Sequence, residues 1–368
     1  MKALDKFAQL LVDYCVNVKK LDEVVISASY EAYPLVRELY RAIVERGGYP
    51  RFLVSDEVLQ EIFYRYAPEE LLEYLSPIDK YIVENINVRI SILSPTHTKP
   101  LVNIDPEKMK KRSIALRPLT EIFMKRDAEG SLRWVVTAYP TRAMAQEAGM
   151  SPLEFEDFVY HALKLHEKDP VEAWIKQAKW QEKIVGFLNK ASEIRIVAED
   201  TDLLLRVDGR KWINDDGKKN MPGGEVFTGP HEDATEGYIE FTYPAVWRGV
   251  EVEGVRLVFK KGMVVEAKAR RGEEFLKKML EVDEGARRLG EAAFGLNYDV
   301  TRFTKEILFD EKIGGTIHLA LGAAYPETGG KNISAIHWDM VKDMKNGKVY
   351  VDGDLVYENG RFLKDVIS

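Results

Sequence analysis

The stretch DEVVISA, residues 22–28, decides the fold class of the first half of this chain. Its β-branched residues between polar flanks predict a strand, and the amphipathic stretch Tyr33–Glu45, which ends at Gly47 and Gly48, predicts a helix. Further strands and helices are predicted in alternation at residues 49–54, 56–66, 88–93 and 135–137. This alternation predicts an α/β amino-terminal domain with a mostly parallel, helix-covered sheet.

The turn between the first strand and the first helix lacks the signature of a dinucleotide site. It reads SASYEA at residues 27–32, with no Gly-x-Gly-x-x-Gly, and no Walker loop occurs anywhere in the sequence. A dehydrogenase of the Rossmann type therefore loses its main support.

After a long helical stretch at residues 170–189, the predicted elements change from alternating strands and helices to mostly strands. We place the domain boundary near Lys190, which gives an amino-terminal domain of residues 1–189, including the long connecting helix, and a second domain of residues 190–368. Strands are predicted at residues 194–197, 203–207, 238–241, 250–259 and 263–269, with one helix at 273–289. The second domain is therefore expected to be a strand-rich α+β domain.

Composition excludes several classes of function. The 368 residues include 53 Lys and Arg against 60 Asp and Glu, a net charge of −7, which argues against nucleic-acid binding. No stretch approaches the roughly 18 uninterrupted apolar residues of a membrane span. The single cysteine, Cys15, excludes an internal disulfide, and the first residues lack the apolar core of a signal peptide. The protein is expected to be cytoplasmic.

Two histidines stand out because they lie in apolar, strand-like runs. His318 lies in TIHLAL and His337 in AIHWD, where Asp339 follows two residues later. On a strand, this spacing puts His337 and Asp339 on one face, as a shared metal ion would require. The alternative is a histidine satisfied by a neighbouring carboxylate. The other histidines are expected to be ordinary surface or loop residues: His97, His161, His166 and His231.

Three glutamates strengthen the metal hypothesis. Glu225 follows a Pro-Gly-Gly turn and precedes an apolar strand, Glu291 follows a glycine, and Glu311 lies in an LFDE run. Glycines let the backbone approach a site closely. Two histidines with four acids form a donor set suited to paired Zn²⁺, Mn²⁺ or Co²⁺.

Five ordered segments of the second half carry a resemblance to a known family. They are PGGEVFTGP at 222–230, LGE at 289–291, FDE at 309–311, HLALG at 318–322 with Tyr325, and IHWD at 336–339. Together they resemble the thermophilic aminopeptidase family of the aminopeptidase T and S type. The first half agrees with that family only in its α/β texture and in length.

The resemblance implies a function and a set of site residues. It implies a metal-dependent exopeptidase that acts on peptides with a free amino terminus. It also implies a dimer that encloses the active site. It makes six residues the ligands of two adjacent divalent ions (Zn²⁺, Co²⁺ or Mn²⁺), with Glu291 bridging them: Glu225, Glu291, Glu311, His318, His337 and Asp339. Tyr325 would stand close by. The chain departs from longer bacterial members by tighter spacing between Tyr325 and His337.

This donor set also suits a hydrolytic mechanism. Two divalent ions can activate a bridging water and polarise a scissile carbonyl. Either Glu291 or Glu311 would shuttle the proton, and Tyr325 would donate to the oxyanion. Two alternatives stay open: a related hydrolase of other amides or esters, and a non-catalytic small-molecule binding protein.

Overall fold

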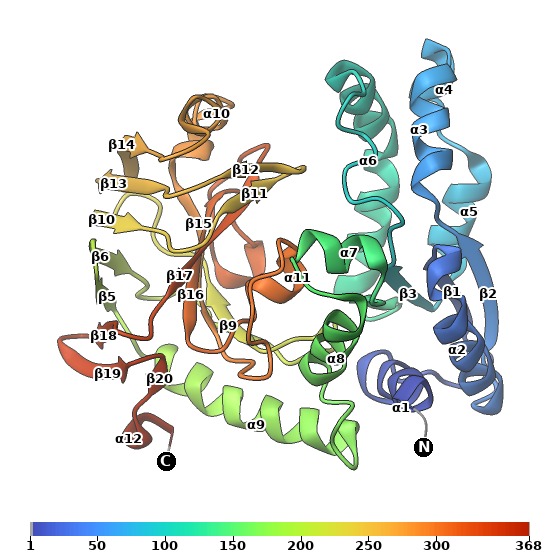
Figure 1. Cartoon of the computed structure of the whole chain (residues 1–368), viewed down its shortest axis with the longest axis horizontal. Helices are drawn as coiled ribbons and strands as arrows, with labels where there is room; N and C mark the ends of the chain where they lie inside the picture. Colours follow the sequence, from blue (N-terminus) through green and yellow to red (C-terminus); the bar gives the residue numbers. More distant parts are fainter. Residues whose placement is uncertain (1–2, 368) are drawn as a thin grey trace. The chain divides into compact units, whose positions relative to one another are not determined.

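The computed structural model describes residues 3–367, which fold into two compact units (Figure 1). The first unit runs up to Glu172 and also takes in Lys218–Met221. The second unit comprises Ala173–Gly217 and the chain from Pro222 onward. The boundary expected near Lys190 would put the long helix of residues 170–189 in the first domain, whereas almost all of this helix belongs to the second unit.

The first unit contains the parallel sheet that the sequence predicts. Its strand order is β2-β1-β3-β4-β8, and every neighbouring pair is parallel. The strands are β1 (Glu23–Ala28), β2 (Tyr49–Val54), β3 (Val88–Leu93), β4 (Arg133–Ala138) and the short edge strand β8 (Asn220–Met221). Strand β8 is supplied by the chain that returns from the second unit.

Helices and turns of the first unit follow the predicted alternation. They are α1 (Ala3–Gln9), η1 (Leu10–Cys15), η2 (Tyr30–Ala32), α2 (Tyr33–Glu45), α3 (Glu57–Tyr66), α4 (Glu69–Glu73), α5 (Pro77–Asn85), α6 (Pro106–Ala128), α7 (Arg142–Glu147) and α8 (Pro152–Ala162). Helix α2 has the predicted bounds. Helix α8 begins with a capping box between Ser151 and Glu154, which satisfies free amide groups of its first turn.

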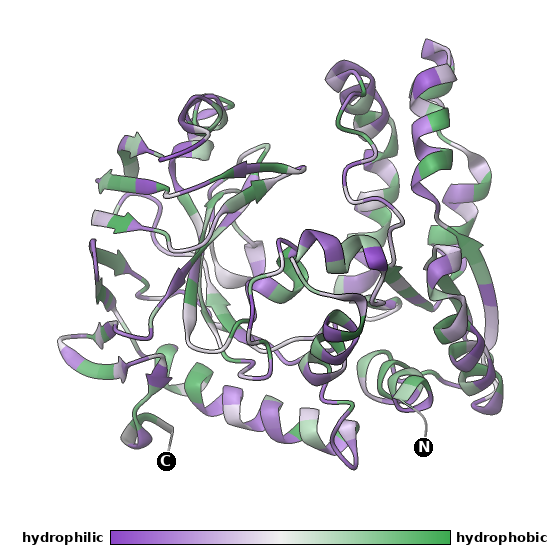
Figure 2. Cartoon of the chain, viewed as in Figure 1, coloured by the Kyte–Doolittle hydropathy of each residue, from purple (hydrophilic) through white to green (hydrophobic). Residues whose placement is uncertain are grey.

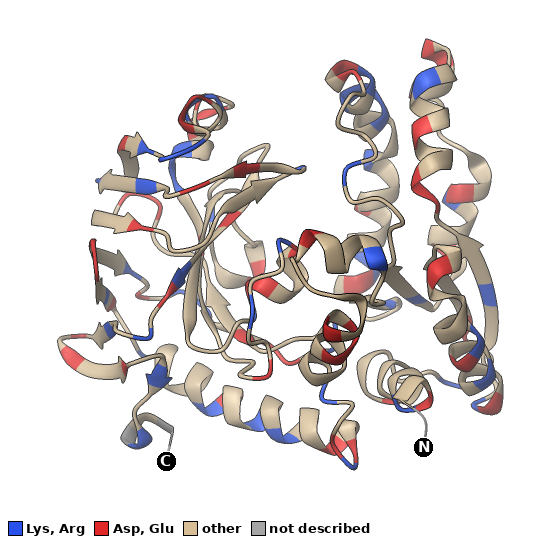
Figure 3. Ribbon diagram, in the orientation of Figure 1, with Lys and Arg blue, Asp and Glu red and all other residues tan. Residues whose placement is uncertain are grey.

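Residues 108–112, a run with four basic side chains, lie on α6, which carries more basic than acidic residues (Figure 3). Lys111 pairs with Glu69 on α4, and Arg117 pairs with Glu121 one turn along α6. This surface is a solvated helix face with mixed charge.

The second unit is built from antiparallel sheets. Its larger sheet has the order β14-β13-β10-β6-β5-β18-β19-β20. These strands are β5 (Glu193–Ala198), β6 (Thr201–Arg206), β10 (Glu236–Glu240), β13 (Arg256–Lys260), β14 (Met263–Lys268), β18 (Lys348–Val351), β19 (Asp354–Glu358) and β20 (Arg361–Phe362). A five-stranded sheet, β17-β16-β15-β9-β7, contains β7 (Ile213–Asp215), β9 (Glu225–Thr228), β15 (Leu289–Gly295), β16 (Thr316–Gly322) and β17 (His337–Asp343).

Apolar residues from both of these sheets form one core (Figure 2). Leu203 and Leu257 contribute from the larger sheet, and Phe294, Leu319 and Trp338 contribute from the five-stranded sheet. Helix α9 (Pro170–Leu188) adds its own last turns to the same core, which explains why it belongs to this unit. Burial of this apolar surface is the main source of the unit's stability.

Two sequence predictions for the second unit are wrong. The predicted helix at 273–289 ends early: α10 covers Glu273–Met279, a short 3₁₀ turn η3 covers Glu284–Arg287, and β15 begins at Leu289. Between α10 and β15 the Asp283 carboxylate accepts hydrogen bonds from the backbone amides of Ala286 and Ala335, so this tertiary contact holds a turn where the local pattern is helical.

The predicted strand at 250–259 is also broken. Gly254 has a φ of +63°, and it separates β12 (Val250–Val252), which pairs with β11 (Ala245–Trp247), from β13 in the larger sheet. In the described part of the chain, no helix is both long and apolar enough to cross a membrane.

Candidate metal centre

Strands β15, β16 and β17 present polar side chains on one face of the five-stranded sheet. Glu291 in β15 and Asp339 in β17 both pair with Ala320 in the strand between them. Paired residues point to the same side of a sheet, so the two carboxylates flank a single methyl group. His318 and His337 lie two residues before Ala320 and Asp339, and they share this face because side chains alternate along a strand.

Small residues stand opposite the larger polar ones. The sheet pairs His318 with Ala293, His337 with Gly322 and Glu225 with Gly295. Gly322 has a φ of +107°, and a Cβ there would lie 2.1 Å from the Ile336 carbonyl oxygen. Only glycine fits that position, so the expectation that glycines allow close approach at this site agrees with the local geometry.

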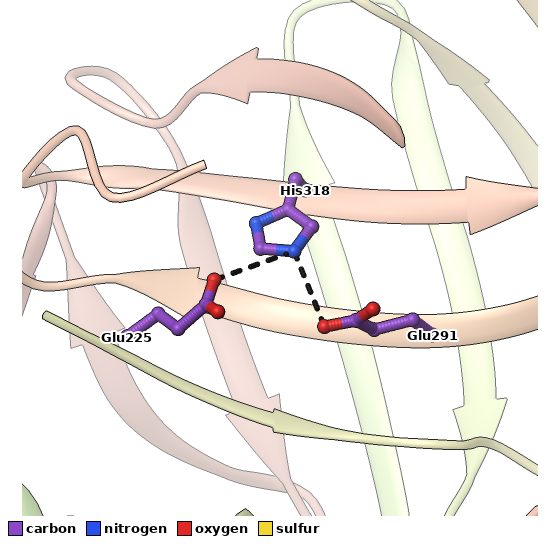
Figure 4. Close-up of side chains that lie close together, drawn as sticks. All are labelled: Glu225, Glu291 and His318. Atoms are coloured by element: carbon purple, nitrogen blue, oxygen red, sulfur yellow. Dashed lines mark hydrogen bonds and ion pairs between the residues drawn. The ribbon is translucent and has the colours of Figure 1, made fainter. Parts of the chain in front are cut away.

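Glu291 contacts both imidazoles, one with each carboxylate oxygen. Its Oε2 lies 3.0 Å from Nε2 of His337, and its Oε1 lies 3.4 Å from Nε2 of His318. His318 Nε2 is also 3.5 Å from Oε2 of Glu225, as Figure 4 shows, and His337 Nε2 is 3.4 Å from Oδ1 of Asp339. Glu291 is therefore placed at the centre of the cluster.

Glu311 reaches the same cluster from outside the sheet. It follows the short helix α11 (Ile307–Asp310), whose last residue is buried. The Asp310 carboxylate accepts hydrogen bonds from the backbone amide of Thr304 at 2.6 Å and from its hydroxyl at 2.9 Å. These bonds fix the turn that places Glu311 at the cluster.

All six residues that the resemblance implies as ligands come together. Their donor atoms form three overlapping sets, each within 4.8 Å: Glu225, Glu291 and His318; Glu291, His337 and Asp339; and Glu311, His318 and Asp339. The one-face arrangement expected for His337 and Asp339 is therefore present. His97, His161, His166 and His231 belong to none of the sets found among the described residues.

A lysine that the sequence analysis missed lies beside this cluster. Lys312 is fully buried, and its Nζ lies 2.7 Å from Oε1 of Glu225 and 3.0 Å from Oδ2 of Asp215, and it also contacts Glu311. Burial would lower the pKa of Lys312, but the three carboxylates raise it well above its usual value. The side chain is therefore an ammonium. Its position directly after Glu311, in a DEKIGG run, was the available signal.

Tyr325 lies at the edge of the site. It follows β16 and precedes the 3₁₀ turn η4 (Pro326–Thr328), and its ring centroid lies 5.0 Å from that of His337 and 5.5 Å from that of Phe227. Burial, together with nearby carboxylates such as Glu291, raises the pKa of the Tyr325 phenol. The hydroxyl therefore stays protonated and able to donate a hydrogen bond, while 41% of the residue remains exposed.

The electrostatics of the cluster favour cations. Burial opposes a charged imidazole, but Glu225 and Glu291 raise the pKa of His318 to about 9, and Asp339 and Glu291 raise that of His337 to about 12. Burial would raise the pKa of Glu291, yet contacts with both imidazoles lower it to about 2. Buried carboxylates of this density need positive charge next to them.

The residues present fit divalent metal. Oε2 of Glu225 and Oδ1 of Asp339 are buried and accept no hydrogen bond from the described residues. Nδ1 of His337 lies 2.7 Å from the Ala323 carbonyl oxygen, which directs Nε2 toward the carboxylates, as carbonyls often do behind metal-binding histidines. Two imidazole nitrogens with carboxylate oxygens suit Zn²⁺, Co²⁺ or Mn²⁺.

Comparison with known proteins agrees with this chemistry. The model of the thermophilic metalloprotease family matches residues 1–362. Aminopeptidase 2 of Geobacillus stearothermophilus is 29% identical, over 97% of this chain and 98% of its own length. Aminopeptidase T of Thermus thermophilus is 28% identical, over 97% of this chain and 95% of its own length.

A solved structure shows the same fold. The wild-type AmpT structure from Thermus thermophilus superposes with a TM-score of 0.85 at 26% identity, covering 98% of this chain and 99% of that one. The similarity therefore extends over both units, including the first half, for which the sequence motifs gave no specific match.

Proposed function

This chain belongs to the thermophilic metalloprotease family, and on that premise we propose that it is a metal-dependent aminopeptidase that removes amino-terminal residues from peptides. The observation that carries the proposal is the convergence of two imidazoles and four carboxylates on one cluster centred on Glu291. The relatives named above are aminopeptidases, which supports the same assignment.

We assign two divalent ions to this cluster. All six residues of the three sets would hold them, with Glu291 shared between the ions because it has one oxygen toward each histidine. When bound, the ions would supply an activated water and polarise the scissile carbonyl. The second unit, expected from the sequence as residues 190–368 and extended by α9, would then carry the catalytic site.

The chain's own residues would complete the reaction. A carboxylate of Glu291 or Glu311 would take the proton from the attacking water and return it to the leaving amine. The protonated hydroxyl of Tyr325 would donate to the oxyanion that forms on the carbonyl oxygen. The surplus of carboxylates would favour a substrate that presents a cationic amino terminus.

Lys312 would set how much negative charge reaches the substrate. Its ammonium compensates Glu225, Asp215 and Glu311 on one side of the cluster. Glu291 and Asp339, which Lys312 does not contact, lie beside His337 and Tyr325. Glu291 and Asp339 would therefore depend on the imidazoles and on bound ions for their compensating charge.

A panel of substrates tests the proposal. Aminoacyl p-nitroanilides and their amino-blocked counterparts would be assayed after EDTA treatment and then with Zn²⁺, Co²⁺ or Mn²⁺ restored. Metal-restored cleavage confined to free amino termini is the expected result. Cleavage of blocked substrates would favour the alternative of a broader amidase. Absence of turnover with every metal would favour a binding protein.

Three further sequence predictions stay predictions. The choice among Zn²⁺, Co²⁺ and Mn²⁺ would follow from which ion restores turnover. A homodimer would be tested by sedimentation. The cytoplasmic location would be tested by fractionation of cells that express the chain.

A further inference from the structure

The two faces of the first unit's sheet differ sharply. On one face, Ile26 and Ile90 are fully buried. On the opposite face, Ser27, Arg89 and Ser91 line a cavity of about 570 Å³. Strand residues alternate between faces, so these three polar residues share one face, together with the apolar Val25 and Val136. A volume of this size is within the range of small-molecule sites, roughly 300–1,000 Å³.

The walls of this cavity are mostly apolar. Val136 of β4, Ile82 of α5 and Leu119 of α6 all line it. One part is closed by a small core of Val25, Ile86 and Leu132, against which Ile82 and Phe123 pack. Apolar walls of this kind hold the body of an organic ligand by burial of its surface.

Two arginines line the cavity without acidic partners. Arg89 donates from Nε to the hydroxyl of Ser91 at 3.3 Å. Arg112 donates to the Tyr74 carbonyl oxygen at 2.6 Å, and its guanidinium lies 5.2 Å from the Phe63 ring centroid. Within the described residues, neither guanidinium has a carboxylate within ion-pair distance. The Arg89 side chain is exposed to solvent in this open cavity, and an arginine side chain stays charged in proteins.

The charge of the lining is therefore positive. Its ionisable residues are Asp79, Arg89 and Arg112. An adjoining cavity of about 560 Å³ shares Ser27, Arg112 and Leu116 with the first, so Arg112 stands where the two meet. Asp56 of the adjoining cavity accepts two hydrogen bonds from the first turn of α3, both at its Oδ1.

We infer that this cavity binds a small apolar carboxylate, with the carboxylate on Arg89 and the apolar body against β4, α5 and α6. A guanidinium pairs with a carboxylate through two parallel hydrogen bonds, and the Ser91 hydroxyl already orients this one. A free apolar amino acid and an organic acid without an amine share this chemistry.

Calorimetric titration of the full chain with 3-phenylpropionate and with 3-phenylpropanamide tests the inference. The acid is expected to bind, and the amide, which matches it in shape but lacks the charge, should bind about 10- to 100-fold more weakly. Phenylalanine distinguishes the sources. If it binds as well as the acid, the ligand is an amino acid; if it does not, the site selects acids without an amine.

Variants identify the site. Arg89→Gln should weaken binding of the acid by about 10-fold or more, whereas Arg117→Gln, which makes the same charge change at an exposed position of α6, should leave it unaltered. Val136→Phe, which fills the cavity without removing a charge, should also weaken it. Circular dichroism would confirm that each variant is folded.

Several results would overturn the inference. They are equal affinity for the acid and the amide, wild-type affinity in both Arg89→Gln and Val136→Phe, or no binding of the acid at millimolar concentration. The measurement uses no metal and no peptide substrate, so it is independent of the proposed function.

Discussion

The two units of this molecule each hold a charged side chain beside a sheet, and the two charges are satisfied in opposite ways. In the second unit, the Lys312 ammonium is fully buried but contacts three carboxylates. In the first unit, the Arg89 guanidinium has a serine hydroxyl as its hydrogen-bond partner and no carboxylate within ion-pair distance among the described residues. We infer from this difference that a charge balanced by carboxylates of the chain itself belongs to a built-in cluster. A charge with no such partner beside a cavity indicates instead a site for a reversibly bound ligand.

The largest effect on activity is expected from a substitution of Glu291, at the centre of the cluster. Glu291→Gln keeps the size of the side chain but removes the charge that contacts both imidazoles. We expect peptidase turnover to fall by about 10³-fold or more while the fold is retained. Steady-state kinetics with metal analysis would measure this. The control Glu266→Gln, at an exposed glutamate paired with Lys268, should keep wild-type turnover.

Wild-type turnover in Glu291→Gln would contradict the assignment of Glu291 as the shared ligand. The comparison between the two units would then also fail, because the cluster of the second unit would hold paired charges that have no catalytic role.

The next largest effect is expected from removing the buried cation. Lys312→Met leaves Glu225, Asp215 and Glu311 buried without their ammonium, and breaking a buried ion pair costs about 3–5 kcal/mol. For a unit of this size, the melting temperature of the metal-free protein should fall on the order of 10 °C. Differential scanning calorimetry would measure it, and added Zn²⁺ should restore part of the loss.

A matched control defines this effect. Lys345→Met removes an exposed lysine that pairs with Asp343, and such surface pairs contribute about 0–1 kcal/mol. An equal drop in the two variants would mean that Lys312 is not specifically stabilised by its carboxylates.

These two expectations also show where sequence reasoning succeeds and where it ends. Glu291 and His337 could be found because acids and histidines are unusual in apolar or glycine-rich strands. Lys312 could have been suspected from its place directly after Glu311, but Asp215 could not be found from the sequence, because its meeting with Lys312 depends on β7 pairing with β9, which places Asp215 opposite Glu225. That register follows from tertiary packing and has no local signature.

The fold shows the same division. The parallel sheet of the first unit was predictable because each strand and helix has its own hydrophobic period. Strand β15 was missed because residues that are buried on both sides have no alternation, so periodicity cannot distinguish a central strand from a buried helix. The glycine at 254 ended a predicted strand because the backbone there needs a positive φ.

The pH dependence of stability should change sign when metal binds. In the metal-free protein, carboxylates raise the pKa of His318 from 6.5 to about 9. Between these values the folded state binds more protons than the unfolded state, so stability is full below pH 6.5 and decreases as pH rises toward 9. Metal must displace these protons, so its binding strengthens over the same interval.

Thermal unfolding from pH 6.5 to 9, with EDTA and with Zn²⁺, measures the two slopes. We expect a falling melting temperature without metal and a flat or rising one with it. Parallel slopes in the two conditions would mean that the histidines do not exchange protons for metal.

The smallest effect on stability is expected from a substitution of Arg89, which has no carboxylate partner. Arg89→Met replaces a charged group that has no carboxylate partner with an apolar chain of similar length, on a cavity wall that is already largely apolar. Because the guanidinium gains little from Ser91 and is exposed to solvent, its removal should change the free energy of unfolding by no more than about 0.5 kcal/mol. Chemical denaturation of the full chain, followed by far-UV circular dichroism, measures this change. A loss as large as that of Lys312→Met would show that Arg89 is a structural charge after all, and the distinction between the two units would fail. A small change together with lost binding of 3-phenylpropionate separates the two roles, because a residue kept for stability cannot be removed without cost, whereas a residue kept for a ligand can.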